Sequence, residues 1–440
     1  MAVRPNHPGG TRFRLYPQAP ILDPAREPET VIVSSPAGSV GPGPEDDRMY
    51  AINPVDKWPP YGVQTRRDGS PYLYLPPWDG DIHPPAFPDR DGHFDYLDEN
   101  SPEFLVAHLF GCVRFVQDIW DGYFGETIEW HSADAFDKME LVHLPRYDNS
   151  RIGFGFIEFG SSESESGIFS HDATNFDIIA HEVGHGIIYS TVGLPDPEGE
   201  TGEYNGFHES AADLVAMISC LHFNSVVDEL LENTRGNLYM LNRLNRIAEL
   251  SQNEQIRLAS NSVTMSEFIH GWRREHLLSQ PLTGAIFDTL IDIFHEQLLD
   301  RGVISPEVEA LADRYEYEPR YQSLVQDMFE NAYAGEMPTF KEALLDARDI
   351  IGHYLAETWR RLPADYLSYL QVGDILCEVD RDFSGGEYAR IIVNNFEYRE
   401  IGLVPLGPQL AKLPKENHMD SSRWMSPDSW EFDAQMREAY

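Results

Sequence analysis

One segment, residues 176–189 (FDIIAHEVGHGIIY), constrains the fold more than any other part of the chain. Its apolar residues cover most of a helix surface, which is typical of a buried element, and it contains the pattern H-E-x-x-H. On a helix of about 3.6 residues per turn, His181 and His185 lie one turn apart on the same face, so both rings can reach one metal ion. Glu182, between them, is placed to take a proton from a water that the metal activates.

A second segment, residues 207–218 (FHESAADLVAMI), carries two carboxylates on an otherwise apolar helix. Glu209 and Asp213 are spaced i and i+4, so they share one face. Two carboxylates that face a hydrophobic interior are costly unless a cation or hydrogen-bond donors meet them. We therefore expect Glu209 to be the third ligand of a zinc ion, and Asp213 to accept the free N–H of a ligating histidine.

The two motifs together resemble those of the thermolysin-like gluzincin metallopeptidases, in which H-E-x-x-H is followed by E-x-x-x-D on the next helix. The resemblance covers about residues 100–360. It implies an α+β fold of two lobes, an N-terminal mixed lobe rich in strands and a C-terminal lobe that is mainly helical, with the active-site cleft between them. It also implies one Zn²⁺ per chain, held by His181, His185 and Glu209, with Glu182 as general base.

The composition and the resemblance suggest four regions. They are a Pro- and Gly-rich N-terminal region with short strands (1–100), an N-terminal catalytic lobe that ends in the H-E-x-x-H helix (101–195), a helical C-terminal lobe (196–405) and a weakly ordered tail (406–440).

Further site residues follow from the resemblance alone. Asn149 and the main chain of Ser150 stand where the family pairs an edge strand with an extended peptide, although turn chemistry also fits a plain turn there. His276 is the best match to the family's histidine that donates a hydrogen bond to the tetrahedral intermediate. His270 is a rival for that role, and a structural histidine is the other alternative. Tyr204 is a candidate for a tyrosine that shares the task.

The same comparison bears on calcium. Asp177 precedes His181 by one turn, and its counterpart in the family helps to bind a structural calcium ion. The position on the Glu209 helix that would supply another calcium carboxylate is Cys220, which argues against a calcium site.

The charge of the chain excludes some partners. The formal net charge is −40 at pH 7, so nucleic acid and anionic membranes would be repelled, and the expected partner is a peptide or protein substrate. The N-terminus has no signal-peptide pattern and no run of 18 apolar residues occurs, so we expect a cytoplasmic protein, or one that is exported by a signal-independent route or trimmed. Three scattered cysteines are expected to be reduced, buried thiols.

Local patterns predict the secondary structure around the motifs. Ser101-Pro102-Glu103 should start a helix that ends near Gly122. Residues 141–144 and 153–159 are expected to be strands, and helices are expected over 238–250, over 283–299, from a capping box at Thr339 to a point before Pro363, and from 365 to 398.

The function that these features predict is zinc-dependent hydrolysis of peptide bonds inside a polypeptide. Two alternatives remain. One is a catalytically silent, zinc-containing module that binds peptides, and the other is a hydrolase of the same class that acts on a non-peptide substrate.

Overall fold

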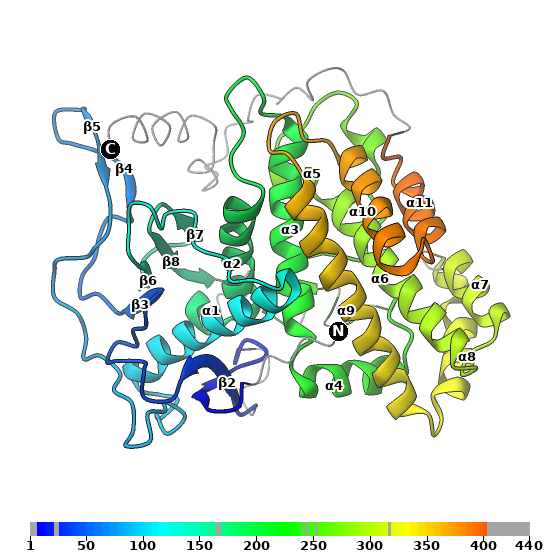
Figure 1. Ribbon diagram of the computed structural model, residues 1–440, viewed down its shortest axis with the longest axis horizontal. Coiled ribbons are helices and arrows are strands. Elements are labelled where there is room, and N and C mark those ends of the chain that lie inside the picture. The colour runs from blue at the N-terminus through cyan, green and yellow to red at the C-terminus, as the bar shows by residue number, and fades with distance from the viewer. Residues whose placement is uncertain are drawn as a thin grey trace.

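The structure, a computed structural model, describes residues 7–21, 26–163, 169–240, 242, 244, 246–251, 254–315 and 318–402. The predicted tail at 406–440 lies outside these residues. The described chain is a mixed α+β fold. In Figure 1 the strands gather at the left and most helices at the right, with α2 and α3 between them.

Most of the described strands precede the helix that carries the H-E-x-x-H motif. The strands are β1 (Gly10–Leu15), β2 (Glu29–Pro36), β3 (Met49–Ile52), β4 (Gly62–Thr65), β5 (Pro71–Tyr74), β6 (Met139–His143), β7 (Ser150–Gly153), β8 (Phe156–Phe159), β9 (Ser161–Glu163), β10 (Phe169–His171), β11 (Arg246–Ser251) and β12 (Glu254–Leu258).

Most helices follow the strands. The α-helices are α1 (Pro102–Phe124), α2 (Phe176–Thr191), α3 (Gly202–Cys220), α4 (Asn224–Thr234), α5 (Glu275–Leu278), α6 (Gln280–Asp300), α7 (Pro306–Tyr315), α8 (Gln322–Tyr333), α9 (Met337–Arg361), α10 (Tyr369–Ser384) and α11 (Ala389–Tyr398). Three 3₁₀ turns are η1 (Asp172–Thr174), η2 (Met265–Phe268) and η3 (Pro319–Tyr321).

The largest sheet among the described residues has four strands in the order β3-β6-β8-β7. β3, from the first hundred residues, runs parallel to β6, and β6 runs parallel to β8. β7 pairs antiparallel with β8 and forms the edge of the sheet that packs against α2. This arrangement places an edge strand beside the helix that carries H-E-x-x-H.

A buried charge network fastens that edge to the segment before β4. Glu158 on β8 is fully buried, and its carboxylate lies 2.6 Å from Lys57 Nζ and 3.0 Å from Arg151 Nη2 on β7. Tyr61 donates its backbone N–H to the same carboxylate. Because removing one partner of a buried ion pair leaves an uncompensated charge, this network fixes the position of β7.

The helices surround one hydrophobic core to which α1, α2, α3, α6 and α9 all contribute. α1 begins as predicted, because the Ser101 side chain accepts a hydrogen bond from Phe104 N, and it ends at Gly125 with a positive φ of 70°. Its Trp120 stacks on Trp359 of α9 with ring centroids 4.8 Å apart. The core therefore holds α1 and α9 against the pair of helices that carry the two motifs.

Two predictions of secondary structure are wrong. The helix expected over 238–250 is absent, since residues 246–251 form β11 and pair antiparallel with β12. The alternation Gln255-Ile256-Arg257-Leu258 was the period-two signal of the partner strand. The single strand expected over 153–159 is a hairpin of β7 and β8, because Gly155 turns the chain with a φ of 87°.

The later helices agree better with the predictions. α6 covers the predicted 283–299, and the expected helices after 365 are α10 and α11, separated by Gly385 and Gly386. α9 ends before Pro363 as expected but starts at Met337, so Thr339 lies inside the helix rather than at its N-cap.

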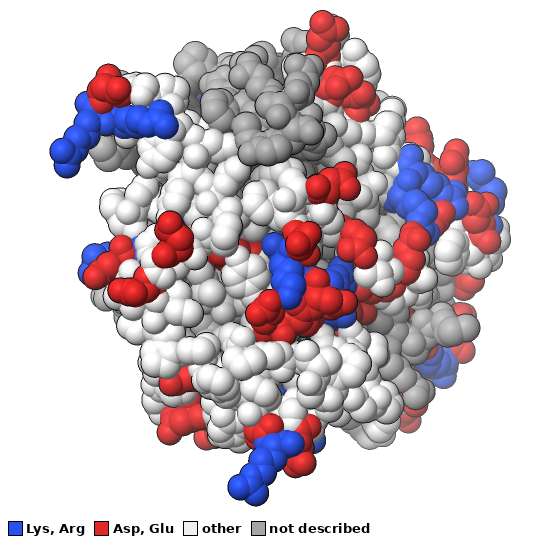
Figure 2. All heavy atoms as spheres, turned by 60° about the vertical axis from the view of Figure 1, so that its left-hand side comes forward, with Lys and Arg blue, Asp and Glu red and all other residues white. Residues whose placement is uncertain are grey.

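The surface charge and the apolarity of the helices bear on possible partners. Figure 2 shows scattered groups of acidic side chains on one face, several of them beside basic side chains, and the net charge of the chain is −40. Within the described ranges, no single helix is long and apolar enough to cross a membrane; α3 and α4 reach that length and composition only together, across a bend of 93°.

Candidate metal centre

Two helices bring the predicted ligands together, and capping residues define where each helix starts. Asn175 caps α2 by accepting hydrogen bonds from Asp177 N and Ile178 N, and Thr201 caps α3 by accepting one from Tyr204 N. These caps fix the residue at which each helix begins. Figure 1 shows α2 and α3 side by side at the centre of the molecule.

A glycine allows the two helices to come close. Gly184 lies between the two histidines on α2, and a Cβ placed on it would be 2.7 Å from Ala212 Cα on α3. Ala212 in turn lies between Glu209 and Asp213. The helices therefore approach each other closely at the level of the four polar side chains.

His181, His185 and Glu209 form a buried group whose nitrogen and oxygen atoms lie within 4.8 Å of one another. The Nε2 atom of His181 is 3.5 Å from Glu209 Oε2, and the Nε2 atom of His185 is 3.8 Å from Glu209 Oε1. Ligands of a tetrahedral zinc ion at bond lengths of about 2.0–2.1 Å are separated by roughly 3.3 Å. Both the donor types and the separations therefore fit a zinc ion at this place.

The other nitrogen of each histidine meets a second residue of α3. His181 Nδ1 is 2.8 Å from Asp213 Oδ1, the contact that the motif spacing predicts. His185 Nδ1 is 2.6 Å from Nδ1 of His208, which the sequence analysis did not consider. Both histidines are thus oriented with Nε2 toward Glu209 and Nδ1 toward a partner, as metal-ligating histidines usually are.

Burial and neighbouring rings set the protonation of this group. Burial alone would raise the pKa of the Glu209 carboxyl, but the rings of His276 and His185 outweigh it and hold the pKa well below its usual value. Burial lowers the pKa of His208 to about 3, so its ring is neutral near pH 7. Glu209 is therefore an anion in this centre, and the His208 ring is neutral.

The remaining predicted catalytic residues are also near this group. Glu182 is 5 % exposed and follows His181 directly on α2. His276, on α5, has a half-exposed side chain whose Nδ1 lies 2.7 Å from Glu209 Oε2, whereas the rival His270 is exposed. Tyr204 donates its hydroxyl hydrogen to the Gly193 carbonyl at 2.8 Å.

The two residues expected to bind substrate lie at the start of the edge strand. Asn149 is half-buried and precedes β7, and Ser150 is its first residue. The Ser150 hydroxyl donates to Asp172 at 2.8 Å, just before the helix α2 begins. This contact ties the start of the edge strand to the segment that leads into the metal helix.

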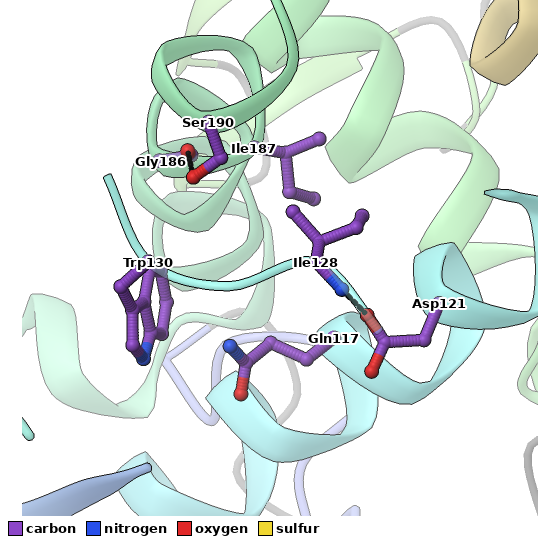
Figure 3. Close-up of a pocket in the computed structure, with 7 residues that line it drawn as sticks. All are labelled: Gln117, Asp121, Ile128, Trp130, Gly186, Ile187 and Ser190. Atoms are coloured by element: carbon purple, nitrogen blue, oxygen red, sulfur yellow. Dashed lines mark hydrogen bonds between the residues drawn. The ribbon is translucent and has the colours of Figure 1, made fainter. Parts of the chain in front are cut away.

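A small hollow beside α2 is lined in part by Gly186, Ile187 and Ser190 (Figure 3). By helix periodicity, these residues lie on the face of α2 opposite to His181 and His185. Of the seven residues that line it, Asp121 is the one ionisable side chain, and its carboxylate accepts hydrogen bonds from Ile128 N and Arg48. The hollow offers no set of metal ligands, so the candidate site is the group on the opposite side of α2.

Comparison with known proteins finds little similarity. No protein-family model and no curated protein matches the chain. Twenty-four chains of solved structures match. One of them is described as the precursor of protealysin, a metalloproteinase from Serratia proteamaculans, and its sequence is 15 % identical to this chain. The match covers 58 % of this chain and 82 % of that chain, with a TM-score of 0.33. A similarity this weak supports no conclusion about the present chain.

Proposed function

We propose that the chain is a zinc-dependent endopeptidase. The observation that carries the proposal is the convergence of His181, His185 and Glu209 from two helices, with Glu182 beside the first histidine. Three protein donors of this kind leave a coordination position for water or substrate, which distinguishes catalytic from structural zinc sites. The substrate would bind in a cleft between the strand-rich and helical parts of the molecule.

The proposed chemistry assigns one role to each residue. When bound, zinc supplies a Lewis acid that polarises the scissile carbonyl and makes a water more acidic. Glu182 accepts a proton from the attacking water and then donates it to the leaving amine, so the carboxylate is restored at the end of the cycle. His276 donates a hydrogen bond to the oxygen that gains negative charge in the transition state.

The edge strand supports a peptide as the substrate. An extended peptide can add to β7 through backbone hydrogen bonds, because β7 is the last strand of the sheet within the part of the chain that the structure describes. Asn149 and Ser150 stand at the start of this strand, and β7 packs against α2. A peptide held there would run past the proposed zinc ligands.

The test combines metal analysis with peptide turnover. Elemental analysis of the purified full-length protein should give about one zinc per chain, and a quenched peptide library should be cleaved, with activity lost to a chelator and restored by zinc. The Glu182→Gln variant should keep zinc and lose cleavage, whereas Glu232→Gln, at an exposed position on α4, should keep both.

Three results would contradict the proposal. Zinc near zero in the wild-type protein would remove the metal centre. Bound zinc without turnover of any peptide would favour the silent peptide-binding module or a non-peptide hydrolase. Undiminished cleavage by Glu182→Gln would show that Glu182 is not the base.

A further inference from the structure

His208 makes a close contact with His185. It lies on α3, directly before Glu209, and is 6 % exposed. Its Nδ1 atom is 2.6 Å from His185 Nδ1, and the two ring planes are inclined by only 21°. The contact is therefore an N–H···N hydrogen bond between two buried imidazoles.

The direction of this hydrogen bond follows from the orientation of His185. Its Nε2 atom faces Glu209 Oε1 and must be unprotonated to bind a metal ion, so a neutral His185 carries its proton on Nδ1. His185 is then the donor and His208 Nδ1 the acceptor. A neutral His208 carries its own proton on Nε2.

We propose that His208 is the positioning residue of His185: its Nδ1 atom, 2.6 Å from His185 Nδ1, fixes the tautomer and ring orientation of this zinc ligand. The inference rests on the metal centre proposed above and extends it to a residue outside the H-E-x-x-H and E-x-x-x-D motifs. His208 performs for His185 the task that Asp213 performs for His181.

The charge balance of the centre explains why a neutral acceptor suits this position. Glu209 and Asp213 are both buried carboxylates, and together they balance the two positive charges of a zinc ion. Glu182 adds a third buried carboxylate nearby. A further carboxylate at 208 would leave more negative charge in the interior without a partner, whereas an imidazole accepts the hydrogen bond and adds no charge.

Two tyrosine rings pack against the His208 ring, and one of its ring nitrogens is buried without a hydrogen-bond partner among the described residues. Tyr189 lies against it with ring centroids 4.2 Å apart, and Tyr204 lies at 5.8 Å. The His208 Nε2 atom is buried and has no hydrogen-bond partner among the described residues. A buried N–H without a partner destabilises the fold, and an apolar ring would fill this position more favourably if packing were its only task.

The test compares zinc affinity in three full-length proteins, the wild type, His208→Asn and His208→Phe, by competition with a chelator. The Asn side-chain oxygen lies the same number of bonds from the backbone as Nδ1, so it restores the acceptor, whereas Phe keeps the ring and removes it. We expect the zinc dissociation constant of His208→Phe to rise about 10- to 100-fold, and that of His208→Asn to stay within a few-fold of the wild type. The melting temperature of metal-free His208→Phe should equal or exceed that of the wild type.

Two results would overturn the inference. One is a His208→Phe protein that binds zinc as tightly as the wild type, and the other is a His208→Asn protein that binds as weakly as His208→Phe. If His208→Phe fails to fold, ¹⁵N spectra of histidine-labelled wild-type protein with zinc decide the question. They should show a coupling between the Nδ1 atoms of His185 and His208, and its absence would refute the hydrogen bond.

The outcome is separable from that of the proposed function. Zinc binding that depends on His208, without cleavage of any peptide, would support the positioning role and contradict the peptidase. Cleavage that depends on Glu182, with a zinc affinity that does not depend on His208, would support the peptidase and contradict the positioning role. A wild-type protein that binds no zinc would contradict both.

Discussion

Replacing Gly184 by alanine tests whether the separation of α2 and α3 determines the metal centre. A Cβ at this position would lie 2.7 Å from Ala212 Cα and 3.0 Å from Val215 Cβ. Carbon atoms in contact prefer about 3.5–4.0 Å, so the new methyl group overlaps α3 by roughly 0.8 Å. The atom it meets first belongs to the backbone, which cannot rotate away as a side chain can.

The expected change in the free energy of unfolding of Gly184→Ala combines two opposing effects. Overpacking a close-packed interior costs about 1–3 kcal/mol, and exchanging glycine for alanine within a helix recovers about 0.5–1 kcal/mol. We expect a net loss of about 1–2 kcal/mol in the free energy of unfolding. If the helices separate by roughly 0.8 Å to relieve the overlap, the histidine-to-Glu209 distances of 3.5 and 3.8 Å move further from the roughly 3.3 Å of a tetrahedral site. Zinc affinity should therefore fall at least about tenfold, which corresponds to about 1.4 kcal/mol.

Urea unfolding of the metal-free proteins and chelator competition measure these two quantities. The matched control is Gly186→Ala, two residues along the same helix, whose Cβ would meet the side chains of Ile152 and Trp130 at 2.8 and 2.9 Å rather than α3. It should lose stability and retain wild-type zinc affinity. Wild-type zinc affinity in Gly184→Ala would refute the link between helix separation and the metal centre.

Three further changes test other parts of the structure. Glu209→Ala should lose zinc in elemental analysis with its far-ultraviolet circular dichroism unchanged, because only the third ligand is removed. Lys57→Met should lower the free energy of unfolding in urea by about 3 kcal/mol, because it leaves the buried Glu158 carboxylate with less compensation. Burial lowers the pKa of His295 from 6.5 to about 3, so the folded state resists protonation and loses stability as the pH falls below 6.5, by about 1.4 kcal/mol per pH unit. His295→Leu should flatten that loss in urea unfolding curves between pH 6.5 and 4; an unchanged slope would contradict the assignment.

The sequence predicts the arrangement of the centre wherever helix periodicity alone decides it. His181 and His185 share a face because they are four residues apart, and the same holds for Glu209 and Asp213. That the two faces meet follows from the cost of burying carboxylates without a cation. The contact of His181 with Asp213 is of this kind, and the structure has it at 2.8 Å.

Features that depend on how elements pack were beyond the sequence reasoning. His208 adjoins Glu209 in the sequence, but its contact with His185 depends on the rotation and separation of α2 and α3. The small residues Gly184 and Ala212, each the fourth residue of its five-residue motif, are the signal in the sequence that indicates close helix packing. The hairpin of β11 and β12 was missed because apolar spacing over 238–250 also fits a helix.

One helix, α3, supplies three side chains that contact the two histidines. α3 contributes Glu209 on the Nε2 side of both rings and, on their Nδ1 sides, Asp213 to His181 and His208 to His185. A shift of α3 along or around its axis would therefore change the third ligand and both orienting hydrogen bonds at once. Of the later helices, α5 also contacts the centre directly, because His276 Nδ1 lies 2.7 Å from Glu209 Oε2. The close contact between Gly184 and Ala212 limits how far apart the two helices lie, so a change at this contact would alter all of these distances together.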